Sequence, residues 1–270
     1  ASCLIQPQTT SLDEYRDRLK DFFDDEIASV FQNNFNGFLA DVPNASRISE
    51  IEAAIGARLD GHMLVTAAQQ ILHDRGVSAN QQRVRGGGEF PGTPEEHAVA
   101  LIAVVVYTME SNVYVLLNEA LRSDNRNPQT LRERWGTYLR SCLLGFRSLP
   151  ASGPKRLYRG VDCLLDNDKV KFSVHRPGPM FWYTIVSASE NRDEAVRFAS
   201  LRRRRGTIFE IEAVEAYQVA PMSAHPREGE FVFVPPAQFS VVSADFDAMP
   251  HVVIRLRQEP TPFNFLKKSS

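Results

Sequence analysis

The sequence predicts an α+β protein whose helices precede its strands. Apolar residues recur at helical spacing through the first half of the chain, up to the stretch Pro150-Ala-Ser-Gly-Pro154. After Pro154 this periodicity gives way to short apolar runs rich in β-branched and aromatic residues, which are typical of strands. Because helices and strands are segregated along the chain, the pattern favours an α+β fold over repeated βαβ units.

The predicted helices of the first half span residues 11–32, 46–59, 63–74 and 93–124, and a fifth begins at Asn127-Pro128 and includes Leu143. The clearest start is Thr93-Pro94-Glu95-Glu96, which combines a capping residue, a proline in the first turn and two acids near the positive end of the helix dipole. The acidic cluster of the first helix, within residues 21–26, is expected to face solvent.

The predicted strands of the second half span residues 156–161, 169–174, 180–187, 207–214, 231–234, 239–242 and 252–256. One helix, over residues 192–201, interrupts them. Neither an internal repeat nor a low-complexity tract is visible.

Composition and charge exclude several classes of protein. Hydrophobic residues make up 43% and charged residues 24%, with a net charge of -2, as in an ordinary globular protein. This charge gives no global field for nucleic acid or a membrane, so neither partner is expected. Cys3, Cys142 and Cys163 lie far apart, which predicts neither a disulfide framework nor a metal site and favours a reducing compartment. No signal peptide is visible, and the longest apolar run, 98–107, is about half of what a bilayer span needs.

Three polar features stand on strands that otherwise consist of apolar residues. The first is Arg159, in the middle of Leu157-Tyr158-Arg159-Gly160-Val161. A guanidinium is costly to bury unless it is paired, and its planar fork suits a phosphate or a carboxylate. Arg159 therefore indicates either a structural ion pair or an anion-binding site.

The second feature is Ser187-Ala188-Ser189, which ends a bulky strand before the helix 192–201. Alone it is a common helix-capping arrangement, and Ser189 fits that role. The third is Glu228-Gly229-Glu230, directly before the strand 231–234. If the chain is already extended there, both carboxylates point to one side, and their repulsion favours a cation or ligand opposite them. The alternative is a solvated turn.

Taken together, residues 95–245 resemble the arginine-serine-glutamate class of mono-ADP-ribosyltransferases, above all its bacterial toxins and effectors. The matching motifs are Tyr158-Arg159-Gly160, Ser187-Ala188-Ser189 with Ala195 and Phe198, and Glu228-Gly229-Glu230 with Pro235-Pro236 and Phe239. Residues similar to the helical lead-in of that class are Tyr107, Thr108, Tyr114, Leu117, Asn118, Leu121 and Arg122.

The chain departs from this class at two places. Ala188 stands where the middle residue is usually threonine, and four residues instead of three separate Glu230 from Pro235. One extra residue in a strand would reverse the direction in which Glu230 points unless a bulge absorbs it. The facing of Glu230 is therefore the first feature to check in the structure.

The resemblance implies a fold and a domain organisation. A helical region at 1–94 would serve as scaffold or recognise a partner. A mixed or antiparallel ADP-ribosyltransferase core of two sheets would follow at 95–260, with a tail at 261–270. NAD is implied as the substrate, and no metal.

The resemblance also assigns roles in the cleavage of NAD. Breaking the bond between nicotinamide and ribose builds positive charge on the ribose, which a fixed carboxylate stabilises. That carboxylate would be Glu230, held by a hydrogen bond from Ser187, while Arg159 would bind the NAD phosphate. Glu228 would orient or deprotonate the acceptor.

Further residues are implied around NAD. Gly160 would let the backbone approach the nicotinamide amide, and Tyr158 and Phe198 would join the NAD-binding set. Phe172, Phe181, Trp182 and Phe198 are the candidates for stacking on nicotinamide, although each also suits the core. The arginine run 202–205 fits either a solvated turn or contacts with phosphate or an acidic partner.

The implied function is transfer of ADP-ribose from NAD to a protein side chain. The first glutamate of the loop favours arginine as acceptor, while some effectors of this class modify threonine of host ubiquitin. We expect a monomeric, secreted or injected bacterial effector or toxin, a virulence factor in host cytoplasm, with a target of the ubiquitin, small GTPase or actin class. The alternatives are an NAD glycohydrolase and a non-catalytic binding module on the same scaffold.

Overall fold

The computed structural model describes residues 35–77, 87–109, 111–122, 127–165, 179–201, 205–220, 222–223, 229–261 and 264–267. The helices of the first half are α3 (Ile48–Ile55), the 3-10 turn η2 (Ala57–Leu59), α4 (Gly61–Asp74), α5 (Pro94–Thr108), α6 (Asn112–Arg122) and α7 (Pro128–Arg147). The strands are β1 (Lys155–Val161), β2 (Met180–Trp182), β3 (Val186–Ser189), β4 (Thr207–Ala213), β5 (Tyr217–Gln218), β6 (Glu230–Phe233), β7 (Ala237–Asp245) and β8 (Val252–Glu259), with helix α9 (Arg192–Ala199) between β3 and β4. This order confirms the α+β prediction.

The start of α5 forms as the sequence predicts. The Thr93 hydroxyl accepts a hydrogen bond from the Glu96 amide, and the Glu96 carboxylate accepts one from the Thr93 amide, which completes a capping box. The prediction of one helix over residues 93–124 is wrong, because α5 ends at Thr108 and the backbone of Met109 is extended. A new helix, α6, then begins at Asn112. The predicted helix 11–32 and strand 169–174 lie outside the described residues.

The strands form one mixed sheet in the order β2-β7-β8-β4-β1-β3-β6-β5. The pair β4-β8 is parallel and the other pairs are antiparallel. The prediction of two sheets is wrong, because Tyr158 of β1 pairs with Ser189 of β3 and so joins both halves of the ladder. The predicted strand 180–187 is also divided, into β2 and β3.

The single sheet nevertheless curls over itself. Trp182 lies on the edge strand β2, and its ring packs against Phe233 of β6, near the opposite edge, with centroids 5.8 Å apart. Phe209 and Phe239 surround the same indole. We call this cluster the sheet core. The strong twist of a sheet of this size allows one ladder to supply both of its layers.

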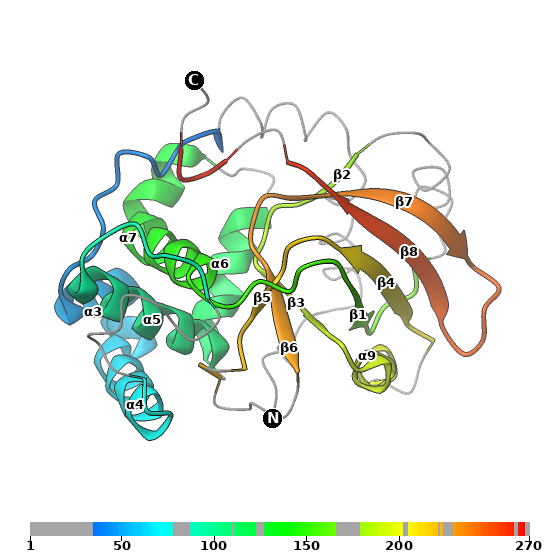
Figure 1. The fold of residues 1–270 in the computed structure, drawn as a ribbon, viewed down its shortest axis with the longest axis horizontal. Coiled ribbons are helices and arrows are strands. Elements are labelled where there is room, and N and C mark those ends of the chain that lie inside the picture. The colour runs from blue at the N-terminus through cyan, green and yellow to red at the C-terminus, as the bar shows by residue number, and fades with distance from the viewer. Residues whose placement is uncertain are drawn as a thin grey trace.

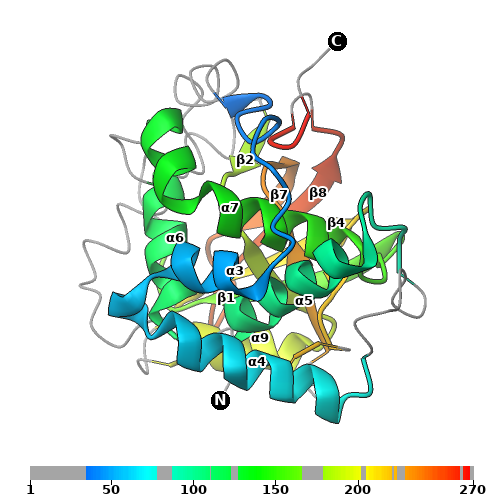
Figure 2. The same ribbon diagram turned by 90° about the vertical axis from the view of Figure 1, so that its left-hand side faces the viewer.

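A second cluster, the helical core, joins the helices to one end of the sheet. It includes Ile51, Val65, Val104 and Leu139 from the helices together with Val232 from β6. Figures 1 and 2 show α3, α4, α5 and α7 stacked beside the strands, while α9 packs separately near β1 and β4. The helical core includes residues on both sides of position 94, and the predicted domain boundaries at 94 and 260 stay predictions. No single described helix is long and apolar enough to cross a membrane, although α5 and α6 meet that test together as a bent pair.

Candidate active site

Arg159 lies half-buried in β1, and its side chain is hydrogen-bonded to the neighbouring strand β3. Its Nη1 atom donates a hydrogen bond to the carbonyl oxygen of Ser187, at 2.7 Å. The motifs that carry Arg159 and Ser187 are therefore brought together across the β1–β3 junction. Since a hydrogen bond from a charged donor is stronger than a neutral one, this contact fixes the guanidinium against β3.

Ser187, Ser189 and Glu230 share one face of the sheet. β3 and β6 are antiparallel, with Ser189 opposite Glu230 and Ser187 opposite Val232. Directly opposed residues lie on the same face, and so do residues two apart on one strand. The alternate residues Ala188, Phe231 and Phe233 point into the sheet core. The ladder thus places the Glu230 carboxylate on the same side as both serines.

The extra residue before Pro235 does not reverse Glu230. Pairing with β3 runs without interruption from Glu230 to Phe233, and Val234 lies outside the strand. The additional residue therefore belongs to the connection that leads through Pro235-Pro236 into β7. The sequence could not distinguish this connection from a shifted strand.

Glu230 is almost completely buried. Its exposed fraction is 1%, and that of Ser187 is 7%. Burying an ionised carboxylate is unfavourable unless hydrogen bonds or an opposite charge compensate for the lost water. Among the described residues, no hydrogen bond joins the Ser187 hydroxyl to the Glu230 carboxylate, so their predicted contact stays a prediction.

The loop that carries Glu228 is described only at its two ends. Glu228 itself lies outside the described residues. Gly229 precedes β6 with a φ of 55°, a left-handed conformation that favours glycine. The Glu230 carbonyl accepts a hydrogen bond from the Val219 amide at 3.0 Å, which brings the two ends together.

Close packing against α9 requires glycine at position 160, which the sequence alone does not show. A Cβ atom at this position would lie 1.8 Å from the carbonyl oxygen of Ala195 in α9. Glycine therefore lets α9 approach β1 closely. The role of Gly160 toward nicotinamide stays a prediction.

Replacement of Gly160 with alanine is expected to lower the free energy of unfolding by about 3 kcal/mol, the upper range for overpacking a core. The obstacle is backbone, which cannot move aside cheaply. Urea unfolding of the two proteins measures the difference. Gly136→Ala in α7 is the matched control, since its new Cβ would lie 3.4 Å or more from its neighbours. Equal stability of Gly160→Ala and the wild type would contradict this packing.

The aromatic candidates for NAD binding lie in different surroundings. Tyr158 packs with Ala195 and Ile208 beside α9, and the buried Phe198 ring lies under the Arg197 guanidinium, 4.6 Å from its centroid. Phe181 and Trp182 are core residues, in the helical and sheet cores respectively. Phe172 lies outside the described residues. A contact of Tyr158 or Phe198 with NAD stays a prediction.

The cap of α9 is Asn191 rather than Ser189. The Asn191 side chain accepts a hydrogen bond from the Asp193 amide. The Ser189 hydroxyl instead accepts one from the Asn191 amide, at 3.0 Å. Ser189 therefore stabilises the turn that follows β3, while Asn191 caps the helix.

A buried network from the helices positions the start of β3. The Asn118 side chain accepts a hydrogen bond from the Ile185 amide at 3.2 Å and donates one to the Tyr107 hydroxyl at 2.8 Å. The Tyr107 hydroxyl donates in turn to the Ile185 carbonyl, at 3.1 Å. Ile185 lies two residues before Ser187. In the sequence Tyr107 and Asn118 only resemble the helical lead-in of the family, and no local pattern predicts this positioning role.

The arginine run 202–205 is described only at Arg205. Its Nη2 atom donates to the carbonyl oxygens of Phe246 and Ala248, at 2.6 and 2.7 Å. Beside it, His251 accepts a hydrogen bond from the Gly206 amide. Burial, and then the charges of Arg192 and Arg205, lower the pKa of His251. Arg205 thus holds the backbone at Phe246 and Ala248. The other three arginines of the run lie outside the described residues.

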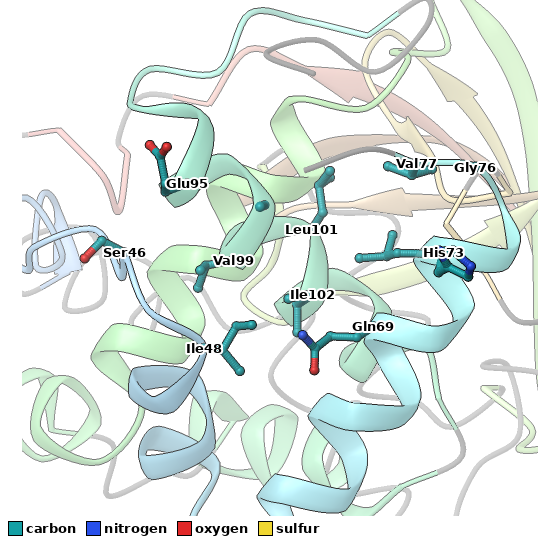
Figure 3. A pocket seen from close by; sticks show the side chains of 12 residues that line it. Ser46, Ile48, Gln69, His73, Gly76, Val77, Glu95, Val99, Leu101 and Ile102 are labelled. Atoms are coloured by element: carbon teal, nitrogen blue, oxygen red, sulfur yellow. The ribbon is translucent and has the colours of Figure 1, made fainter. Parts of the chain in front are cut away.

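A cavity of about 700 Å³ lies between α4 and α5, beside Ile48 of α3 (Figure 3), and is lined by none of the predicted site residues. Within the described part of the chain, no group of three His, Cys, Asp or Glu residues could hold a metal ion.

The sequence model of the family described as NAD:arginine ADP-ribosyltransferase matches residues 58–259. The chain belongs to this family and is accordingly an ADP-ribosyltransferase-family enzyme whose substrate is NAD. No curated protein matches the sequence.

Solved structures share the fold at low sequence identity. The type III effector XopAI from Xanthomonas axonopodis pv. citri is 13% identical, with a TM-score of 0.58, and the match covers 95% of this chain and 96% of that one. The eucaryotic mono-ADP-ribosyltransferase ART2.2 is 14% identical, with a TM-score of 0.57 and coverage of 87% and 96%. The ADP-ribosyltransferase Vis, a toxin from Vibrio splendidus, is 16% identical, with a TM-score of 0.52 and coverage of 82% and 89%. At these identities the likeness concerns the fold.

Proposed function

We propose that the protein is a mono-ADP-ribosyltransferase that moves ADP-ribose from NAD to a side chain of a host protein. The observation that supports this best is the buried Glu230 carboxylate on the same strand face as Ser187, with Arg159 bonded to Ser187. A guanidinium that is bonded to the Ser187 carbonyl and a buried carboxylate on the next strand suit a substrate with a phosphate at one end and a developing cation at the other.

In the proposed reaction, the bond between ribose C1 and the nicotinamide nitrogen breaks. Nicotinamide leaves with the electron pair of that bond, so positive charge develops on the ribose. Glu230 stabilises this charge, and a hydrogen bond from Ser187 would hold the carboxylate in place. Arg159 binds the phosphate, while the backbone at Gly160 contacts the nicotinamide amide and Tyr158 and Phe198 complete the NAD site.

The second half of the reaction forms the bond to the acceptor. A nucleophilic atom of the target side chain attacks ribose C1, and its proton passes to a base. We assign this role to Glu228, because a carboxylate that precedes Glu230 by two residues lies in the same loop. Arginine is the acceptor we favour, and threonine of ubiquitin is the second choice.

The biological setting is proposed from the relatives. XopAI is a type III effector and Vis is a toxin, and both share this fold. We propose that this protein is likewise a bacterial effector or toxin, secreted or injected, that acts as a monomer in host cytoplasm. A target of the ubiquitin, small GTPase or actin class fits this setting.

Replacement of Glu228 with alanine tests the proposed function against NAD hydrolysis. We expect transfer to protein to fall by about 100-fold, the usual range for loss of a general base. Nicotinamide release without an acceptor should persist, since Glu230 remains. Labelled NAD incubated with host lysate measures transfer, and nicotinamide release measures hydrolysis.

Glu133→Ala is the matched control, because this exposed residue of α7 bonds only to Gln129 among the described residues. If the wild type labelled no protein and released nicotinamide equally fast with and without protein acceptors, and if Glu228→Ala left that release unchanged, the glycohydrolase would be the better assignment. The absence of any NAD turnover in the wild type would favour the binding module.

A further inference from the structure

The ring of His251 lies at a point where three elements meet. His251 precedes β8, Ser200 follows α9, and Gly206 precedes β4. The Nε2 atom of the ring lies 3.0 Å from the hydroxyl oxygen of Ser200, and Nδ1 accepts a hydrogen bond from the Gly206 amide at 3.2 Å. The exposed fraction of His251 is 5%. One buried side chain thus joins the end of a helix to the starts of two strands. We call the ring with its contacts to Ser200 and Gly206 the latch.

The contacts of the latch require a neutral imidazole in one tautomer. A backbone N–H can only donate, so Nδ1 carries no proton and the proton of the neutral ring is on Nε2. Nε2 therefore donates to the Ser200 hydroxyl, which donates in turn to the Val196 carbonyl at 2.7 Å. A second proton would place an N–H on Nδ1, opposite the Gly206 amide. Protonation of His251 therefore replaces a hydrogen bond with two opposed donors.

Gly206 has little room to move away from a protonated ring. It is buried, and its carbonyl accepts a hydrogen bond from the Val252 amide at 3.1 Å. A Cβ atom on Gly206 would lie 2.3 Å from the carbonyl oxygen of Ala199 and 2.5 Å from that of Val161, so its backbone is closely surrounded. A buried amide that loses its acceptor destabilises the folded state.

The charges around the ring also oppose a second proton. Burial, and then the positive charges of Arg192 in α9 and Arg205 before β4, lower the pKa of His251. The acidic residues on α9, on β4 and at the β7–β8 connection are either exposed or paired with other arginines; they are Asp193, Glu194, Glu210, Glu212, Asp245 and Asp247. The geometry and the charges therefore both favour the neutral ring.

We propose that the latch is acid-sensitive and holds the end of α9 to the starts of β4 and β8 only while His251 is neutral. Above about pH 6.5, the ordinary pKa of histidine, its contribution to stability is fully present. As the pH falls through this value, the unfolded chain binds a proton that the folded state excludes, so this contribution is lost. The latch therefore opens at the pH of an acidified compartment.

The opening of the latch affects the strand of the candidate site. α9 packs closely on β1 at Gly160, directly after Arg159. A loosened α9 removes that support from β1. The inference does not depend on the proposed function, because it concerns the stability of the folded state alone.

The test compares unfolding in urea of the wild type, His251→Asn and His73→Asn, at about pH 7.5 and about pH 5.5, one unit on either side of the ordinary pKa of histidine. The asparagine oxygen can accept the hydrogen bond from the Gly206 amide in place of Nδ1, and asparagine does not titrate. His73 is an exposed residue of α4 and provides the control. NMR spectra of the ring nitrogens follow the protonation of His251 in the folded wild type.

We expect acidification to raise the equilibrium constant of unfolding more in the wild type than in His251→Asn, by a factor of between about two and about ten. The upper limit follows because the unfolded ring is protonated about ten to one at the lower pH. The lost bond to Ser200 lowers the stability of the variant at both pH values, so it cancels in this comparison. His73→Asn should follow the wild type. The NMR spectra should show a proton on Nε2 and none on Nδ1 at the higher pH.

Two results would overturn the latch. One is an equal rise of the unfolding constant in the wild type and in His251→Asn, which would show that His251 does not cause acid sensitivity. The other is a folded wild type in which His251 is half-protonated at or above about pH 6.5, because the folded state would then bind the proton at least as well as the unfolded chain. If His251→Asn did not fold, the NMR titration of the wild type would still decide between these outcomes.

Discussion

Replacement of Glu230 with glutamine is expected to reduce kcat for nicotinamide release by about 1,000-fold, the upper range for loss of one preorganised electrostatic contact. The carboxylate is 1% exposed, so its charge would act on the ribosyl cation with little screening by water. Glutamine keeps the shape but not the charge. Release of nicotinamide from NAD measures the effect directly.

The control for this prediction is Glu210→Gln. Glu210 lies on β4 and pairs with Arg192 and Arg255, outside the candidate site. We expect this variant to keep its activity, because ion pairs near the surface contribute about 1 kcal/mol or less to stability. Retention of more than half of the wild-type activity in Glu230→Gln would remove Glu230 from the mechanism.

Replacement of Arg159 with lysine is expected to lower kcat/KM for NAD by about 100-fold, mainly through a higher KM. An ammonium group cannot reproduce a guanidinium fork that bonds the Ser187 carbonyl and also presents donors to a phosphate. Initial rates over a range of NAD concentrations separate KM from kcat.

Arg156→Lys is the matched control for this second prediction. Arg156 lies on the same strand, is exposed, and pairs in register with Glu212 of β4 rather than with β3. Its replacement should leave both kinetic constants within about twofold of the wild type, as expected for a surface substitution. Equal effects of the two substitutions would show that Arg159 does not bind NAD.

The sequence predicted those features that depend on local chemistry. The start of α5 was predictable because Thr93, Pro94 and Glu96 together satisfy the first amides of a helix. The strand of β6 was predictable from its apolar run. The proximity of Arg159 to Ser187 followed from the motifs and not from any local pattern.

Features that depend on distant parts of the chain were not predictable. One residue pair, Tyr158 with Ser189, turns the expected two sheets into one, and no sequence pattern encodes a single pair. The clash that requires Gly160 comes from α9, and Ile185, which donates a hydrogen bond to Asn118, lies 67 residues away from it. The direction in which Glu230 points depends on whether Val234 belongs to the strand. Only the pairing with β3 shows that the strand ends at Phe233.

The central claim is that this enzyme transfers ADP-ribose to protein through Glu230. Mass spectrometry of host lysate incubated with NAD and the enzyme tests it most directly. We predict acceptor peptides that gain roughly 541 Da, the mass of one ADP-ribose group, with the wild type but not with Glu230→Gln. If the wild type produced no such adduct, or if Glu230→Gln produced it at the same level, the claim would be contradicted.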